Sequence, residues 1–222
     1  MREYPMAVED YVKVIYAHTE WQPEPITSSV LAARLGLKPS SVTEMVKRLT
    51  GLGLVEHRPY SAVTLTPDGA SLALRMVRRH RLIETWLVQE HAYTWDEVHD
   101  EAEVLEHAIS DRLLASIDER LGHPVRDPHG DPIPTVGGDI RVPDAVLLRE
   151  ANEHSEVRVV RISDQDPELL RYLVENGIAL DATLTVIGRS QFGGGFAIRR
   201  TDGTELYLGD AALASIWVAV AA

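Results

Sequence analysis

A change of hydrophobic period part-way along the chain is the feature that most constrains its fold. Up to about residue 122, apolar residues recur every three or four positions, as they do in amphipathic helices. After about residue 156 this period gives way to short segments that are typical of strands. These segments span 157–162, 184–188, 196–200, 205–209 and 216–220, with one helix at 167–175. We therefore expect an α+β protein whose helical N-terminal part precedes a small C-terminal β-barrel.

Three helices and a hairpin are predicted at the N-terminus. The first helix spans 6–19, the second begins at Thr27 or Ser28 and is closed by Gly36, and the third is opened by Pro39 and Ser40. Residues 54–65 then predict two short strands with a tip at residues 59–61. This order is typical of a winged helix-turn-helix that binds DNA. The alternative is a plain α+β domain in which the serines and threonines only cap a helix.

The net charge of −12 argues at first against nucleic acid. Residues 1–74, however, hold seven basic against eight acidic side chains, so most of the negative charge lies in residues 75–222. A locally basic face near the N-terminus is therefore allowed. The candidate contacts to bases, phosphates and the groove beside the wing are Lys38, Ser40, Ser41, Thr43, Glu44, Lys47, Arg48, Arg58 and Tyr60. Glu44 could accept a hydrogen bond from cytosine or could simply cap its helix.

Histidine and glutamate gather in the sequence HDEAEVLEH, His99 to His107. If this stretch is helical, His99, Glu103, Glu106 and His107 share one stripe, and upstream His80 and Glu84 lie one turn apart. Imidazole and carboxylate together suit a divalent first-row transition metal. The chain has no cysteine, so thiolate ligands and disulfides are excluded. The alternative to a metal site is a solvated helix face.

Composition places the chain among ordinary globular proteins. Its 222 residues are 45% hydrophobic and 25% charged, and no apolar run is long enough to span a membrane. The N-terminal segment lacks the apolar core of a signal peptide, so we expect a cytoplasmic protein without a membrane partner. We predict a DNA-binding domain at 1–74, a helical metal-binding and dimerisation domain at 75–140, a linker at 141–155 and the barrel at 156–222. The apolar surface of the helices between 67 and 122 favours pairing of two copies across a two-fold axis.

Five segments, taken in order, resemble the diphtheria toxin repressor family of metal-dependent transcriptional regulators. They are EDYVKVIY (9–16), PSSVTEMVKRL (39–49), RRHRLIE (78–84), VHDEAEVLEH (98–107) and PHGDPIP (128–134). The resemblance covers nearly the whole chain and implies a homodimeric repressor, not an enzyme. It further implies a double-stranded operator with an inverted repeat and a C-terminal SH3-like domain.

The resemblance also implies two sets of metal ligands. The principal site would consist of Asp10, Glu103, Glu106 and His107, and the second of His80, Glu84 and His99 with Asp166 or, as a fallback, Glu168. Asp166 is equally able to cap the helix that begins at Pro167.

Iron-responsive members have Met and Cys at the positions of Asp10 and Glu103. Two hard oxygen ligands there favour the manganese-responsive branch, with two Mn(II) per subunit and Fe(II), Co(II), Zn(II) or Cd(II) as substitutes in vitro. Three positions depart from known members. Lys13 replaces a Glu of the short manganese regulators, Leu169 replaces a ligating Gln, and Glu44 replaces a base-contacting Gln.

Three other functions remain as alternatives to a manganese-activated repressor. An iron-dependent repressor of the same family would use the same ligands. A metallohydrolase would need a nucleophile arrangement that the sequence does not present beside these ligands. A winged-helix regulator that senses an organic ligand would bind DNA equally well in the presence of a chelator.

Overall fold

The computed structural model describes the chain except residues 1–3, 23, 59–60, 190–194 and 221–222. It divides into two compact units. Unit 1 comprises Met1–His80 and Pro134–Asp139, and unit 2 comprises Arg81–Ile133 and Ile140–Ala222. Helix α4 (Pro67–His91) begins in the first unit and ends in the second.

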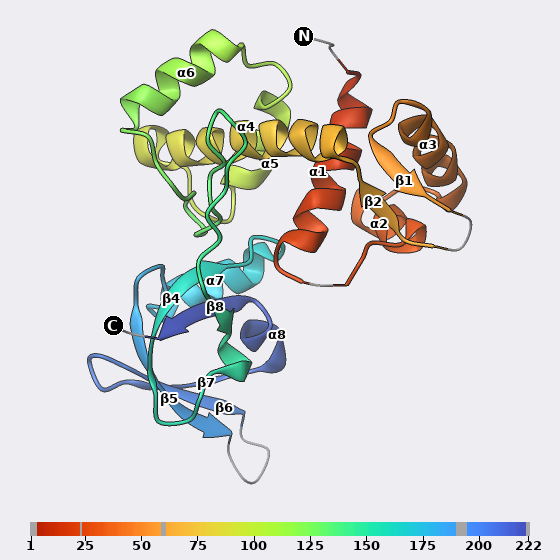
Figure 1. Cartoon of the computed structure of the whole chain (residues 1–222). Helices are drawn as coiled ribbons and strands as arrows, with labels where there is room; N and C mark the ends of the chain where they lie inside the picture. The colour runs from red at the N-terminus through yellow and green to blue at the C-terminus, as the bar shows by residue number, and fades with distance from the viewer. Residues whose placement is uncertain (1–3, 23, 59–60, 190–194, 221–222) are drawn as a thin grey trace. The chain divides into compact units, whose positions relative to one another are not determined.

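Unit 1 contains a winged helix, as predicted. Figure 1 shows its three helices beside the two-stranded hairpin. The helices are α1 (Met6–Glu20), α2 (Ser28–Leu35) and α3 (Pro39–Gly51), and the strands are β1 (Val55–His57) and β2 (Val63–Leu65). The hairpin is antiparallel, with Val55 opposite Leu65. Apolar residues from all five elements form one core, including Val12, Leu31, Val46 and Val63.

The caps of α2 follow from its sequence. The hydroxyl of Thr27 accepts the backbone N–H of Val30 at 3.3 Å, so Thr27 rather than Ser28 is the N-cap. Gly36 ends the helix with φ of 64°, a left-handed conformation that glycine adopts without strain. Pro39 then lies in the first turn of α3, where its missing N–H is not needed.

The helical period between Trp95 and about Gly122 predicts one continuous helix, but the structure has two, α5 (Val98–Leu105) and α6 (Asp111–Arg120). Ser110 causes the second start, because its hydroxyl accepts the N–H of Leu113 at 3.3 Å and caps α6. The predicted ligand stripe is therefore interrupted. His99 and Glu103 lie on α5, whereas Glu106 is its C-cap residue and His107 follows it.

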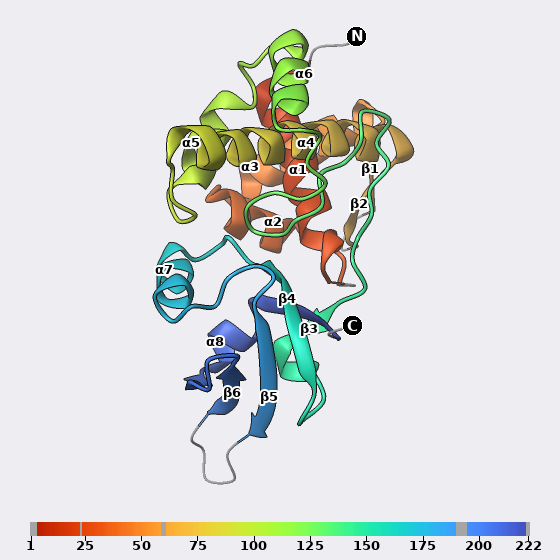
Figure 2. The same ribbon diagram turned by 90° about the vertical axis from the view of Figure 1, so that its left-hand side faces the viewer.

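The C-terminal part of unit 2 is a single antiparallel sheet of six strands in the order β3-β8-β4-β5-β6-β7. Figure 2 shows β4, β5 and β6 with helices α7 and α8 beside them. Register shifts in β4 between Val159 and Arg161 and in β5 between Val186 and Gly188 mark β-bulges, which bend the sheet. The elements are β3 (Val146–Leu147), the 3-10 helix η1 (Leu148–Glu150), β4 (Glu156–Ile162), α7 (Pro167–Glu175), β5 (Thr183–Arg189), β6 (Phe196–Arg200), β7 (Glu205–Leu208), α8 (Asp210–Leu213) and β8 (Ile216–Val220).

All five predicted strands and the helix at 167–175 are present. The stretch 141–155, expected to be a linker, contributes β3 and η1, and Leu148 lies fully buried in the core of the sheet. The glycines from Gly193 to Gly195, whose place between two predicted strands favours a hairpin turn, fall largely outside the described residues, as does Tyr60, which was predicted at the tip of the wing. Within the described part of the chain, every helix is too short or too polar to cross a membrane.

Candidate metal centres and nucleic-acid interface

A first cluster of metal-ligand side chains, the Glu84 cluster, consists of Glu84, His99 and Asp164. It lies within unit 2, and one ligand atom of each residue lies within 4.8 Å of the others. The Nδ1 of His99 is 3.3 Å from Glu84 Oε1 and 3.3 Å from Asp164 Oδ2. Glu84 comes from α4 and is only 1% exposed. His80, one turn earlier on α4, is also buried.

The acidic side chain that the structure places on His99 is Asp164, not Asp166. Asp166 is exposed and accepts the backbone N–H groups of Glu168 and Leu169 at 3.0 and 3.1 Å. It is the N-cap of α7, which was the alternative role considered for it. Glu168, the fallback, is exposed in the first turn of α7. The carboxylate that contacts His99 is therefore two residues earlier in the loop than the one expected.

In the Glu84 cluster, His99 and Asp164 strongly shift each other's pKa values. Burial alone lowers the pKa of His99, but hydrogen bonds to Asp164 and Glu84 raise it to about 11. Burial raises the pKa of Asp164, yet the hydrogen bond and charge of His99 lower it overall. The protonated imidazole of His99 thus places a positive charge between the carboxylates of Glu84 and Asp164. A metal ligand must be a neutral imidazole, so a cation would compete with this proton.

The remaining predicted ligands are divided between the two units. Asp10 lies half-buried on α1 in unit 1. Glu103, Glu106 and His107 lie in unit 2, where Glu106 is fully buried and its Oε1 is 3.4 Å from His107 Nε2. Glu103 Oε1 is 3.6 Å from His99 Nε2, one turn away on α5.

A buried charged network surrounds the turn at residues 127–131. Asp131 accepts a hydrogen bond from Arg161 Nε at 2.7 Å and lies 3.5 Å from Arg81. Asp127 lies 3.6 Å from Arg81, but burial together with the nearby charges of Asp131 and Glu84 raises the pKa of Asp127 to about 8. The sequence alone does not distinguish these residues, because only the folded turn places Asp127 and His129 beside Glu84 and Asp131 beside two arginines.

The predicted DNA-contacting side chains within the described residues are exposed. On α3, all of whose residues are described, the structure contains no side-chain hydrogen bond that caps the helix start. Thr43 Oγ1 donates to Pro39 O at 2.9 Å. The serines and Glu44 are therefore not used as caps, which was the alternative role. The exposed predicted contacts are Lys38, Ser40, Ser41, Thr43, Glu44, Lys47, Arg48 and Arg58.

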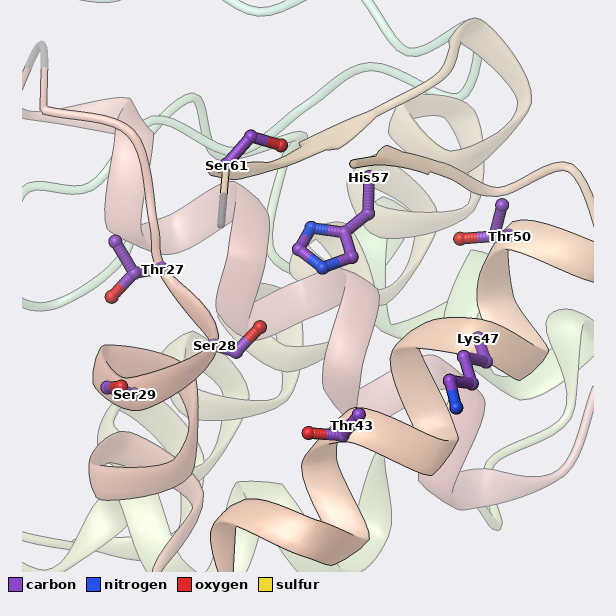
Figure 3. Close-up of a pocket in the computed structure, with 8 residues that line it drawn as sticks. All are labelled: Thr27, Ser28, Ser29, Thr43, Lys47, Thr50, His57 and Ser61. Carbon is purple, nitrogen blue, oxygen red and sulfur yellow. The ribbon is translucent and has the colours of Figure 1, made fainter. Parts of the chain in front are cut away.

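A concave surface in unit 1 includes part of the exposed side of α3 and encloses a volume of about 810 Å³. Figure 3 shows that its side chains come from the start of α2, from α3 and from the hairpin. Its lining side chains carry hydroxyls, one imidazole and one ammonium group, which are groups that bind phosphate oxygens. The lining residues are Thr27, Ser28, Ser29, Thr43, Lys47, Thr50, His57 and Ser61. Of these, only Thr43 and Lys47 were predicted, because the others lie outside α3, the recognition helix expected for a helix-turn-helix, or at its end.

Comparison with known proteins identifies the family. Residues 6–63 match the family model of the iron-dependent repressor N-terminal DNA-binding domain, 66–135 that of its metal-binding and dimerisation domain, and 146–220 the FeoA domain. The diphtheria toxin repressor of Corynebacterium efficiens is 31% identical over 197 residues, covering 84% of this chain and 85% of that protein. The chain belongs to the diphtheria toxin repressor family.

Comparison with solved structures shows that the similarity extends to the three-dimensional fold. A manganese-dependent transcriptional repressor in complex with manganese is 48% identical, with a TM-score of 0.92 over 96% of this chain and 100% of that chain. ScaR with bound Zn²⁺ is 34% identical, with a TM-score of 0.82 over 96% of this chain and 99% of that chain. As a member of the diphtheria toxin repressor family, the chain is a metal-dependent, DNA-binding transcriptional repressor and not an enzyme.

Proposed function

We propose that this member of the family is activated by Mn(II) and represses genes of manganese transport and metal homeostasis. The observation that carries the proposal is the donor set. Every predicted ligand is a carboxylate or an imidazole, and the two positions that distinguish the branches are Asp10 and Glu103. Mn(II) favours such oxygen-rich sites, whereas thiol and thioether ligands suit later metals. The 48% identical repressor that binds manganese supports this assignment.

The Glu84 cluster fits a divalent cation as the second site. Two carboxylates and one imidazole converge there within 4.8 Å, and Glu84 is buried where an uncompensated charge is costly. We propose that Glu84, His99 and Asp164 hold this ion. When bound, the cation supplies the positive charge that the proton on His99 supplies in its absence.

The principal site would couple DNA binding to metal. Asp10 belongs to unit 1, which carries the recognition helix, while Glu103, Glu106 and His107 belong to unit 2. Carboxylates that share a site repel one another without a cation, so joining these groups requires the metal. We infer that the metal selects the orientation in which the recognition helices of a homodimer match two half-sites of an inverted repeat.

On the operator, α3 would lie in the major groove of double-stranded DNA. Lys47 and the hydroxyls of the concave surface would contact phosphates, and the exposed start of α3 would contact base edges. Since DNA is the target, the protein would act in the cytoplasm. We further propose that the domains follow the expected boundaries, with residues 146–155 assigned to the C-terminal domain because β3 pairs with β8.

Replacement of Asp10 tests the proposal. Metal coupling of about 1 to 3 kcal/mol corresponds to roughly 5- to 150-fold in affinity. We expect Asp10→Ala to lose an activation by Mn(II) of that size in fluorescence anisotropy with promoter DNA. Dimer mass, measured by light scattering, should be unchanged. Glu9→Ala removes the same charge one position earlier on α1 and should retain activation. Full activation of Asp10→Ala by Mn(II) would overturn the proposed coupling.

A further inference from the structure

One imidazole lies on the concave surface of unit 1, and the predicted DNA contacts do not include it. His57 is the last residue of β1 and pairs with Val63 of β2, so the hairpin fixes its position. Figure 3 shows its ring extending from the hairpin into the concave surface, whose other side is formed by α3 and the start of α2. His57 is partly exposed, so a ligand that enters this surface can reach the ring.

The two nitrogens of the His57 ring have different surroundings. Nδ1 lies 3.4 Å from the backbone oxygen of Ala62, and because a carbonyl can only accept, Nδ1 carries the hydrogen of the neutral ring. Nε2 is then an acceptor, and it points into the concave surface (Figure 3). A phosphate oxygen is also an acceptor, so it cannot hydrogen-bond to Nε2 of the neutral ring. The protonated ring instead presents an N–H and a positive charge there.

Several hydroxyl groups of the concave surface already donate their hydrogens to backbone oxygens. Those of Thr43 and Thr50 are donated to carbonyls of α3, each at 2.9 Å. That of Ser61 is donated to a carbonyl of the hairpin at 2.8 Å. Among the lining residues, Lys47 and His57 are the two that can carry a positive charge. They are therefore the strongest donors available to an anion at this surface.

The ionisable groups around His57 favour a bound anion. Lys47 reaches the surface from α3, and the lining residues from the start of α2 have hydroxyl side chains. Strand β2 consists of Val63, Thr64 and Leu65 and has no ionisable side chain. On the hairpin, the neighbours of His57 are Glu56 and Arg58, and Glu56 points to the opposite face of β1 because side chains alternate along a strand. Within the lining described by the structure, no carboxylate competes with an entering anion.

We propose that His57 binds a phosphate of the DNA backbone in its protonated form, so that operator binding takes up a proton. This inference rests on the proposed contact between the concave surface and DNA. Imidazole is the side chain whose charge ordinarily changes between pH 5 and 8, so the contact becomes stronger as the pH falls through that range. Uptake of one proton per subunit raises the association constant by up to about 10-fold per subunit for each pH unit.

Three substitutions test this role. Binding of the Mn(II)-saturated chain to a labelled genomic fragment that it retains is measured by fluorescence anisotropy at about pH 6.5 and about pH 8.0. His57→Gln cannot become charged, so it should gain less affinity at the lower pH than the unmodified chain. His57→Arg keeps its charge and should bind tightly at both pH values. His91→Gln replaces an exposed histidine at the end of α4 and should match the unmodified chain.

Comparison between variants removes any effect of pH on the metal ligands, because all of them share those ligands. The same gain in affinity at the lower pH for His57→Gln and the unmodified chain would overturn the role of His57. Salt dependence gives a second readout that a merely structural role would not change. At about pH 6.5, the plot of log association constant against log salt should be steeper by about 0.9 per subunit in the unmodified chain than in His57→Gln.

Calorimetry of the unmodified chain covers a variant that fails to fold. Titration of the fragment in buffers with different ionisation enthalpies counts the protons exchanged, and net uptake is expected. Metal-activated DNA binding without proton uptake would overturn the role of His57 and leave the repressor proposal intact. Failure of the Mn(II)-saturated chain to bind genomic DNA at either pH would overturn both.

Discussion

At the scale of single residues, the proposed second metal site depends on which of two aspartates in the loop before α7 faces His99. Asp164 and Asp166 are two positions apart, and a motif comparison alone does not separate them. Asp166 precedes a proline at a helix start, a position that favours capping, and in the structure it caps α7. Asp164 is left to contact His99. The residue type was predictable, but the position depended on how the loop folds against α5.

Substituting each aspartate by asparagine separates the two roles. Asp164→Asn removes a charged ligand from the Glu84 cluster and should weaken Mn(II) binding at that site by at least about 10- to 100-fold. Asp166→Asn should leave metal affinity unchanged, and stability as well, because asparagine caps helices as well as aspartate. Isothermal titration calorimetry and thermal unfolding measure both. Weaker metal binding in Asp166→Asn alone would restore Asp166 as the ligand.

At the scale of elements, the turn at residues 127–131 holds the helical part of unit 2 against its sheet. A side chain at Gly130, whose φ is +94°, would place its Cβ 2.1 Å from the oxygen of Val160 on β4. The next residue, Asp131, binds Arg161 of the same strand. Close backbone approach, and not only the turn, therefore requires glycine here.

Two glycine-to-alanine variants measure how much a side chain at this close backbone contact would lower the free energy of unfolding. Gly203 has a similar φ of +86°, but a Cβ there would meet nothing within 4 Å. Gly203→Ala should lower the free energy of unfolding by about 1 kcal/mol through backbone strain alone. Gly130→Ala adds overpacking of about 1 to 3 kcal/mol. Denaturant unfolding followed by circular dichroism compares them, and equal losses would show that the contact with β4 does not matter.

Elements with a clear local period were predictable, and those that depend on distant contacts were not. The strands after residue 156 alternate or are β-branched, and α7 begins at a proline, so their positions follow from sequence. The two-residue strand β3 has no period and exists because β8 pairs with it. The break between α5 and α6 depends on Ser110. Serine can lie within a continuous helix, but here its hydroxyl accepts the backbone N–H of Leu113 and caps α6.

At the scale of the whole molecule, the division into two units distinguishes the metal sites. Glu84, His99 and Asp164 all belong to unit 2, so a cation there would stabilise one unit. Asp10 belongs to unit 1 and its proposed partners to unit 2, so a cation there would link DNA recognition to the rest of the chain. The family and the winged helix were predictable from sequence, whereas the contact between Asp164 and His99 required the fold.

Binding of the apo-protein to fragments of its own genome tests the central claim most directly. The fragments are offered with chelator, with Mn(II) and with anaerobic Fe(II), at equal free metal concentrations. A manganese-activated repressor should retain specific fragments at lower free Mn(II) than free Fe(II), and none with chelator. Equal retention of the same fragments in the presence of chelator would contradict metal activation of DNA binding.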